Sequence, residues 1–257
     1  MDDDALTGFH LVLPIRKWEG LSIFLARLMI KLDPDRQIDE ERLDVILRSN
    51  ADAIVVGGTQ GITVEKVRSL LKRVHSFSRE IILEVTDASC ALEGPYRYWV
   101  PVVLNAGDPH WIIRAHARAI RRWKDPHITD RLVPVGYIVL NEESAVAALT
   151  GADAMIDDEE LVGLCQVGHY LFRFPLIYIE YSGKWGCMDR LARIRGRIPQ
   201  APLVYGGGIR EGWQARTVAS LVDTVIVGNM IYEAQDANEL ESQLHTICQA
   251  IRTDDGG

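Results

Sequence analysis

The stretch PLVYGGGIREG, Pro202 to Gly212, runs from apolar residues directly into three consecutive glycines. Glycine weakens a strand and loses more conformational entropy on folding than any other residue. Three glycines at this point therefore indicate a tight turn, or backbone N–H groups left bare so that a ligand can approach them. One helical segment later the apolar run DTVIVGN (223–229) also ends near a glycine.

Similar apolar runs recur along the chain, separated by amphipathic segments. Eight runs predict strands, over residues 28–32, 52–58, 80–85, 98–104, 134–140, 176–182, 202–207 and 223–229. They are apolar on both faces, as buried parallel strands are. The alternation of eight strands with helices predicts an α/β fold, a closed (β/α)₈ TIM barrel. We expect a single domain over residues 1–257, with an N-terminal extension over about residues 1–27.

The connection between the third and fourth runs departs from this alternation. It holds only TDASCALEGPYR (86–97), which includes Gly94 and Pro95. A parallel crossover normally needs a dozen or more residues, and usually a helix. We therefore expect a loop in place of the helix after the third strand. The resulting gap in the barrel wall would admit a long apolar ligand.

The composition is that of a globular protein, with 47% hydrophobic and 25% charged residues. A net charge of −8 argues against nucleic-acid binding. The four cysteines form no C-x-x-C pair, which favours a reducing compartment over disulfides or a zinc site. The acidic start MDDDALTG is unlike a signal peptide. The apolar segment 21–30 is shorter than the roughly 20 residues that a bilayer span needs, so we expect a cytoplasmic protein.

In a barrel of this kind the active site lies at the carboxyl ends of the strands. The residues found there are Lys31, Asp33, Thr59, Glu180, Ser182, Gly207, Gly208, Gly228 and Asn229. The loops after strands seven and eight frequently bind phosphate, through bare N–H groups and helix N-termini. Lys31 would add a charge and Ser182 a hydroxyl. The alternative for the glycines is a plain tight turn.

Two further groups at these ends carry chemistry. Asp33 and Thr59 offer a carboxylate and a hydroxyl to Mg²⁺, which also binds substrate phosphates; the alternative is a helix cap and a turn. Glu180 lies among apolar residues between Tyr178 and Tyr181. A carboxylate inside a barrel is costly unless it is paired or functional. It would serve as a general base, or face a developing positive charge; the alternative is a salt bridge to a neighbouring strand.

Five ordered motifs carry a family resemblance: KLDPD (31–35), GGTQGIT (57–63), YIEYSG (178–183), YGGGI (205–209) and VGNMIYE (227–233). Together they resemble the geranylgeranylglyceryl phosphate synthase family, including its bacterial PcrB branch. The segments VPVVLN (100–105) and AALTGADA (147–154) are more similar to the bacterial branch. The resemblance implies a barrel with a loop in place of the helix beside strand three. It also implies Mg²⁺-dependent transfer of a polyprenyl group (C15–C35) from its diphosphate to the hydroxyl of glycerol 1-phosphate.

The resemblance assigns roles to individual positions. Asp33 and Thr59 would bind Mg²⁺, and Glu180, with Tyr178 beside it, would take or orient the proton of the acceptor hydroxyl. The positions that would hold the acceptor are Lys31, Tyr178, Ile179, Glu180, Tyr181, Ser182, Gly183, Gly207, Gly208, Gly228 and Asn229. The prenyl tail would occupy the gap in the wall. A homodimer is also implied.

Two residues depart from the family pattern. Lys184 follows EYSG, where relatives usually have a small or apolar residue. Its charge would pair with a carboxylate and favour 3-phosphoglycerate, the acceptor that the moenomycin-type branch joins to a farnesyl group. The alternative is a solvent-facing lysine. Trp99 in strand four would limit the tail to a shorter chain, C15 or C20; the alternative is core packing.

Two segments carry residues suited to contacts outside the barrel. Leu21, Phe24, Leu25 and Leu28 fall at helical spacing, and such a helix would cover the barrel floor, pack on a partner subunit or touch a membrane. The basic run RAHARAIRRWK (114–124) would allow peripheral contact with anionic headgroups; its alternative is a solvated helix face.

Two other functions share some of these features. A different phosphate-binding barrel enzyme, an isomerase or aldolase on a sugar phosphate, would use the same glycine loops. It would need neither Asp33 and Thr59 together nor the gap in the wall. A non-catalytic binding protein would have a degenerate site, whereas a competent residue fills every motif position here.

Overall fold

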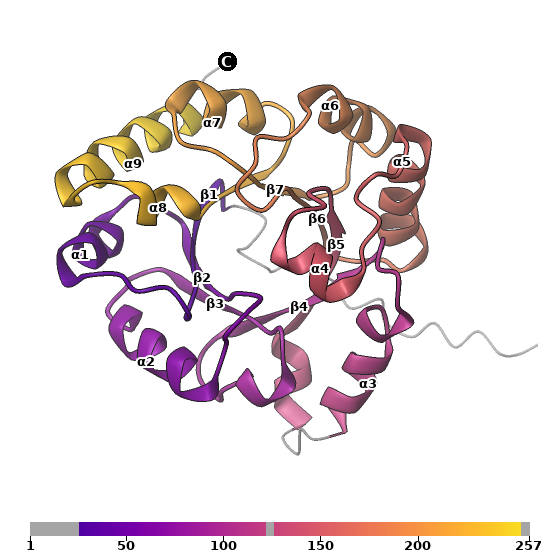
Figure 1. Cartoon of the computed structure of the whole chain (residues 1–257), viewed down its shortest axis with the longest axis horizontal. Coiled ribbons are helices and arrows are strands. Elements are labelled where there is room, and N and C mark those ends of the chain that lie inside the picture. Colours follow the sequence, from indigo (N-terminus) through magenta and orange to yellow (C-terminus); the bar gives the residue numbers. More distant parts are fainter. Residues whose placement is uncertain (1–25, 122–125, 253–257) are drawn as a thin grey trace, which may run out of the picture.

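The computed structural model describes residues 26–121 and 126–252. Its eight strands form one closed parallel barrel in chain order (Figure 1). The strands are β1 (Leu28–Leu32), β2 (Ala53–Val56), β3 (Glu80–Glu84), β4 (Arg97–Val103), β5 (Leu132–Val139), β6 (Leu176–Glu180), β7 (Leu203–Gly206) and β8 (Thr224–Val227). The predicted α/β TIM barrel is confirmed.

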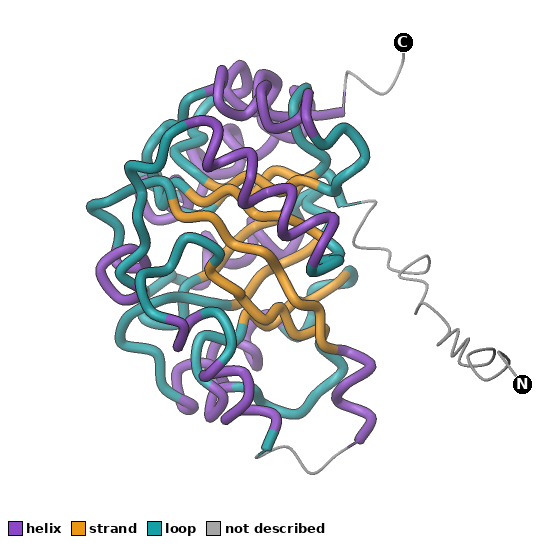
Figure 2. The backbone as a smooth tube through the Cα atoms, turned by 90° about the vertical axis from the view of Figure 1, so that its right-hand side faces the viewer, coloured by secondary structure: helices purple, strands orange, loops and turns teal. Residues whose placement is uncertain are grey.

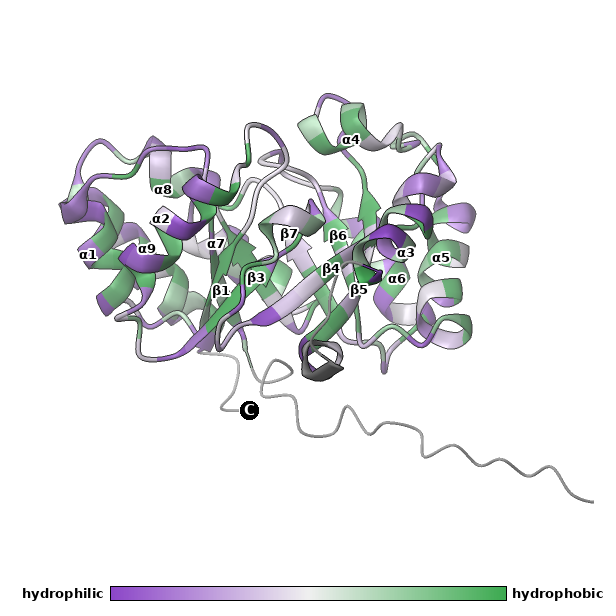
Figure 3. Ribbon diagram, turned by 90° about the horizontal axis from the view of Figure 1, so that it is seen from below, coloured by the Kyte–Doolittle hydropathy of each residue, from purple (hydrophilic) through white to green (hydrophobic). Residues whose placement is uncertain are grey.

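Helices surround these strands, which run through the middle of the molecule (Figure 2). They are α1 (Glu40–Arg48), α2 (Val64–Val74), α3 (Arg114–Ile120), α4 (Ala145–Thr150), α5 (Asp158–Gln166), α6 (Met188–Arg197), α7 (Gly212–Ala219), α8 (Asn229–Glu233) and α9 (Ala237–Arg252). Side-chain caps explain where several of them begin, because Asp39, Thr63, Ser144 and Asp157 each accept a hydrogen bond from the first turn. In side view, α4 and α8 stand at the same end of the barrel (Figure 3).

The connection between β3 and β4 holds only a three-residue 3₁₀ turn, Ala88–Cys90. The predicted loss of the helix after strand three is therefore confirmed. Other irregular turns are Pro109–Trp111, before α3, Pro126–Arg131, before β5, and the π-helical Val167–Leu171, after α5.

The core has two layers. Side chains inside the barrel, among them Met29, Val55, Val135 and Val204, pack against one another. A larger outer layer fills the space between the strands and the helices. Because successive strand residues point to opposite faces, each strand contributes to both layers.

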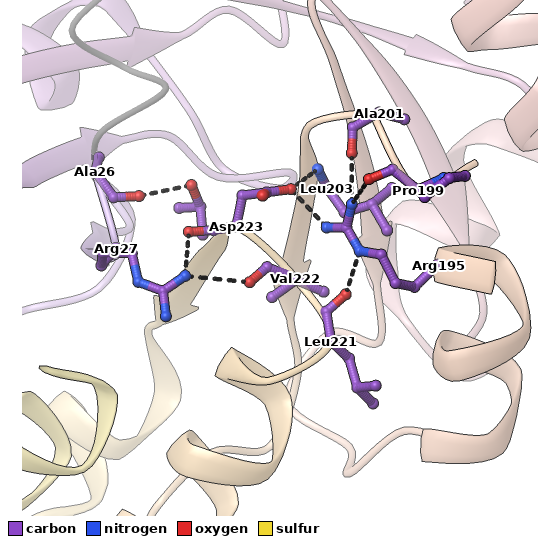
Figure 4. A network of polar contacts seen from close by, with 10 residues as sticks. Ala26, Arg27, Arg195, Pro199, Ala201, Leu203, Leu221, Val222 and Asp223 are labelled. Atoms are coloured by element: carbon purple, nitrogen blue, oxygen red, sulfur yellow. Dashed lines mark hydrogen bonds and ion pairs between the residues drawn. The ribbon is translucent and has the colours of Figure 1, made fainter. Parts of the chain in front are cut away.

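The amino-terminal end of the barrel is closed by a polar network (Figure 4). Arg195 Nη2 lies 2.6 Å from Asp223 Oδ2, and the same oxygen accepts the backbone N–H of Leu203 at 2.8 Å. Thr224 Oγ1 donates to Ala26 O at 2.7 Å. These bonds join the starts of β7, β8 and β1, on the face opposite the expected active site.

Three further expectations concern the N-terminal segment, membrane-spanning helices and the cysteines. The proposed N-terminal helix with Leu21, Phe24 and Leu25 lies outside the described residues, and Leu28 begins β1 instead. No described helix is long and apolar enough to cross a membrane. All four cysteines are free thiols, and Cys187 is exposed whereas Cys90, Cys165 and Cys248 are buried.

Candidate active site

A polar pocket opens at the carboxyl ends of the strands. It brings together most of the predicted site residues, namely Lys31, Asp33, Thr59, Tyr178, Glu180, Ser182, Gly183, Lys184, Gly207, Gly208, Gly228 and Asn229. These come from β1, β2, β6, β7, β8 and the loops that follow them. The tips of the loops after β7 and β8 therefore face one cavity.

The structure does not bring the other three predicted side chains to this pocket. Ile179 and Tyr181 belong to the outer layer of the core, because they alternate with Tyr178 and Glu180 along β6 and its end. Trp99 is fully buried inside the barrel, and its ring meets that of Tyr178 edge-on with centroids 6.4 Å apart. It packs the core and does not line the apolar groove described next. This position is that of the core-packing alternative, and an effect of Trp99 on the length of the prenyl tail stays a prediction.

An apolar groove leads away from the polar pocket through the part of the wall that lacks a helix. Its walls come from β4, the turn after β3, α3 and α4, and its apolar lining includes Ala88, Val100, Pro101, Val103, Trp111, Ala115, Ala119 and Leu149. The groove and the pocket share Lys31, Thr59, Val146, Glu180 and Ser182. An apolar ligand and a polar ligand would therefore meet at these shared residues.

Glycine is required at two points of the pocket. Gly208, the last of the three consecutive glycines after β7, has φ +58°, and a Cβ there would overlap the backbone of Lys184 and Trp185. A Cβ at Gly58 would overlap the carboxylate of Asp33. The first glycine lets the β7 loop turn with its N–H groups near the cavity, which suits an oxyanion. The second makes room for a carboxylate.

Charged and phenolic groups cluster inside the barrel at the junction of the two cavities. Lys31 Nζ lies 2.7 Å from Glu84 Oε1, and Tyr137 OH donates to the other oxygen of Glu84. Glu180 Oε1 accepts the N–H of Ser182 at 2.6 Å, and Tyr178 lies two residues earlier on the same strand.

Burial sets the protonation of this cluster. It raises the pKa of Glu180 above its ordinary value, although Lys31 and Tyr178 act in the opposite direction. For Lys31, burial disfavours the charged form, but Glu84 and Glu180 outweigh it and the pKa lies above the usual range. Burial also raises the pKa of Tyr137 well above its ordinary value, which leaves this phenol neutral and able to donate. Glu180 is thus a carboxylate with an enhanced affinity for a proton.

Three residues near the predicted positions were missed by reasoning from the sequence. Glu84 ends the apolar run of β3 as Glu180 ends that of β6, so the same signal was available. Tyr137 gave no signal, because only the barrel brings it to Glu84. Arg36 follows KLDPD directly, and its guanidinium lies 3.7 Å from the ring centroid of Tyr232 and donates to Asn229 Oδ1 at 3.1 Å. It lines the polar pocket and would bind an anion there.

Lys184 lines the same pocket and has a carboxylate partner within the chain. Its Nζ lies 2.5 Å from Glu143 Oε2, and the lysine side chain is 51% exposed. Glu143 also lines the pocket. The cation is therefore compensated before any ligand arrives.

Asp33 and Thr59 fit a magnesium ion that is shared with a substrate. The described residues hold no group of three or more His, Cys, Asp or Glu side chains that would bind a metal alone. Mg²⁺ usually takes one or two carboxylates, keeps waters and binds substrate phosphates. Asp33 Oδ1 accepts the N–H of Asp35 at 2.8 Å, which orients the carboxylate, and Gly58 leaves it space.

Comparison with known proteins gives consistent results. A family model described as the PcrB family matches residues 15–251. The heptaprenylglyceryl phosphate synthase of Geobacillus kaustophilus (strain HTA426) is 40% identical over 208 residues, covering 81% of this chain and 87% of that protein. The enzyme of the same name from Geobacillus thermodenitrificans (strain NG80-2) is 37% identical over 230 residues, covering 90% and 94%.

Solved structures show the same fold at lower identity. The wild-type GGGPS from Thermoplasma volcanium has a TM-score of 0.76 and 20% identity, covering 89% of this chain and 93% of its own. The (S)-3-O-geranylgeranylglyceryl phosphate synthase from Thermoplasma acidophilum, in complex with its substrate sn-glycerol-1-phosphate, has a TM-score of 0.75 and 18% identity, covering 89% and 94%.

Proposed function

Because the chain belongs to the PcrB family and is a prenyltransferase, we propose that it joins a heptaprenyl group to glycerol 1-phosphate through an ether bond. One observation carries this proposal most directly. The apolar groove and the polar pocket meet at Lys31 and Glu180, so a prenyl tail and a phosphorylated acceptor would meet there. The names of the similar Geobacillus enzymes support the heptaprenyl donor.

The proposed chemistry assigns a task to each group. The acceptor hydroxyl oxygen bonds to C1 of the allylic donor while the bond from C1 to the diphosphate oxygen breaks. The diphosphate leaves with the electron pair, and the hydroxyl proton passes to Glu180, whose raised pKa suits a general base. The glycine loops after β7 and β8 hold the acceptor phosphate. Asp33 and Thr59 would hold Mg²⁺, which when bound offsets the charge on the leaving diphosphate.

The acceptor is proposed to be glycerol 1-phosphate rather than 3-phosphoglycerate. Lys184, the residue expected to pair with the carboxylate of 3-phosphoglycerate, is already paired with Glu143. The carboxylate of Glu143 would also repel that of 3-phosphoglycerate. The tail is proposed to be long because the bulky Trp99 lies inside the barrel and not in the groove.

The test is a substrate panel. The protein is incubated with labelled farnesyl, geranylgeranyl or heptaprenyl diphosphate, each with glycerol 1-phosphate or 3-phosphoglycerate, with Mg²⁺ or with EDTA. We expect an ether product that is most abundant with heptaprenyl diphosphate and glycerol 1-phosphate, and that is lost in EDTA. Absence of an ether from every pair would reject the proposal, and a preference for 3-phosphoglycerate would reject the acceptor.

Two partner proposals accompany this function. We propose peripheral contact with an anionic membrane through α3 and the residue before it, because Ile113 and Ile120 are 62% and 54% exposed and Arg114 and Arg118 lie between them in the sequence. Cosedimentation with anionic and neutral vesicles tests this contact. A homodimer and a cytoplasmic location stay predictions from the family resemblance and the sequence; sedimentation velocity tests the dimer.

A further inference from the structure

At the junction of the two cavities, the cation of Lys31 pairs directly with one of two buried carboxylates. The ammonium of Lys31 lies 2.7 Å from Glu84. The carboxylate of Glu180 instead accepts the N–H of Ser182 at 2.6 Å. Of the two buried acids, Glu84 is thus the direct partner of the cation, whereas Glu180 is held by a neutral backbone N–H.

Glu84 is itself held firmly in place. It is 7% exposed, one oxygen faces Lys31, and the other accepts the hydroxyl of Tyr137 across the barrel. A Cβ at Gly57, the residue directly after the neighbouring strand β2, would lie 2.6 Å from Glu84 Cβ. The position of the carboxylate therefore depends on β1, β2, β3 and β5 together. These contacts stabilise the charged carboxylate of Glu84, because burying a carboxylate without such partners would cost folding free energy.

We propose that Glu84 is a positioning residue, which holds the ammonium of Lys31 at the junction and thereby keeps Glu180 free to accept the acceptor's proton. This inference rests on the proposed function. Without Glu84, the ammonium of Lys31 would lack its counter-ion and would pair with Glu180, the other buried carboxylate that acts on it. A carboxylate paired with a cation is a weaker base.

The groups that act on Glu180 give the sign of the effect. They are Lys31 from β1, Glu84 from β3, and Tyr178 with the Ser182 N–H from its own strand and loop. Lys31 lowers the pKa of Glu180, and Glu84 raises it. Removing the charge of Glu84 therefore lowers the pKa of Glu180 in two ways. The repulsion between the two carboxylates is lost, and Lys31 is released to pair with Glu180. The phenols of Tyr137 and Tyr205 stay neutral, because burial raises the pKa of both.

The experiment compares Glu84→Gln and Glu84→Asp in the full chain, by steady-state kinetics from acid to neutral pH. Activity falls in acid as the base is protonated, so a lower pKa of Glu180 moves this limb to lower pH. For Glu84→Gln we expect the limb to move down by about one pH unit and kcat to fall about tenfold or more. Glu84→Asp keeps the charge, and we expect a limb near that of the wild type and a smaller loss of kcat.

The order of the two variants separates positioning from mere packing. Glutamine copies the shape of glutamate and aspartate copies its charge, so a packing role would make Glu84→Gln the more active variant. The matched control is Glu80→Gln, which removes a carboxylate at the opposite end of the same strand, where it pairs with Arg97. We expect this control to leave kcat and the acid limb unchanged.

Each outcome decides the inference. An unmoved acid limb in Glu84→Gln, or a glutamine variant more active than the aspartate variant, overturns it. Should circular dichroism show that Glu84→Gln does not fold, the pair Glu84→Asp and Glu84→Asn makes the same comparison at equal length. Failure of the proposed function is a separate result, because the wild type would then form no ether with any substrate pair.

Discussion

At the proposed metal site, the absence of a side chain at Gly58 leaves space for the carboxylate of Asp33. A Cβ at Gly58 would occupy the space of the Asp33 carboxylate. We expect Gly58→Ala to turn that carboxylate away and to raise the Mg²⁺ concentration for half-maximal activity about tenfold, if about 1.4 kcal/mol of metal binding is lost. The measurement is a Mg²⁺ titration of ether formation.

The control for this prediction is Gly163→Ala within α5. Nothing lies within 4 Å of a Cβ at Gly163, and alanine is preferred to glycine inside a helix by roughly 0.5–1 kcal/mol. We expect this variant to unfold at a slightly higher temperature, with an unchanged Mg²⁺ titration. An equal Mg²⁺ requirement in Gly58→Ala and the wild type would contradict the proposed role of Asp33.

At the scale of residues, the sequence predicts groups that stand at strand ends and does not predict pairs across the barrel. Asp33, Thr59 and Glu180 follow or end apolar runs, so their convergence follows from the fold. The pairing of Glu84 with Lys31 and Tyr137 depends on which side chains meet inside a closed barrel, which no local pattern encodes. Ile179 and Tyr181 entered the prediction with their motif, although strand alternation turns them outward.

Among the elements, α3 forms the side of the apolar groove. Ala115 and Ala119 of this helix line the groove, whereas Ala117 is exposed elsewhere on the same helix. We expect Ala119→Phe to fill part of the groove and to raise KM for heptaprenyl diphosphate about tenfold. The shorter farnesyl diphosphate would be affected less, so the product ratio would move toward the short tail.

Ala117→Phe is the matched control for this prediction. It adds the same ring to the same helix but outside the groove, and we expect an unchanged product ratio. Competition between labelled heptaprenyl and farnesyl diphosphates measures both variants. A shift of equal size in the two variants would assign the effect to the helix as a whole and not to the groove.

Element order was predictable because length and turn residues limit the connections. The short segment 86–97 excluded a helix, and the structure has only a 3₁₀ turn there. The start of β5 was predicted two residues late, at Pro134 instead of Leu132. Residues before Val135 pair with β4 alone, since the ladder with β6 begins at Val135. Proline has no backbone N–H to donate. It is tolerated at Pro134 because the strand pairs there with one neighbour only, so that no hydrogen bond of the sheet is lost.

At the scale of the whole molecule, the two ends of the barrel have different tasks. The pocket lies at the carboxyl ends of the strands, and the network around Arg195 and Asp223 ties the opposite ends of β7 and β8 together (Figure 4). This division is common in such barrels, where residues at the amino-terminal face serve stability. Mutations at the two ends should therefore separate stability from catalysis.

Arg195→Met tests that separation. The guanidinium is 23% exposed and donates to the carbonyls of Leu221, Pro199 and Ala201 besides Asp223. Its loss leaves several acceptors unsatisfied, which costs about 2 kcal/mol or more, and lowers Tm by roughly 4–8 °C in a protein of this size. We expect kcat at 25 °C to be unchanged, because none of the bonds described for this network reaches the pocket residues.

Arg193→Met is the matched control. Arg193 lies on the same helix as Arg195, is half-exposed and lies 3.3 Å from Asp158 of α5. Such surface pairs contribute about 1 kcal/mol at most. Thermal unfolding and steady-state kinetics on the two variants test both expectations. A Tm loss no larger in Arg195→Met than in Arg193→Met would show that the network does not stabilise the fold, and a kcat that falls with Tm would show that the two ends are not independent.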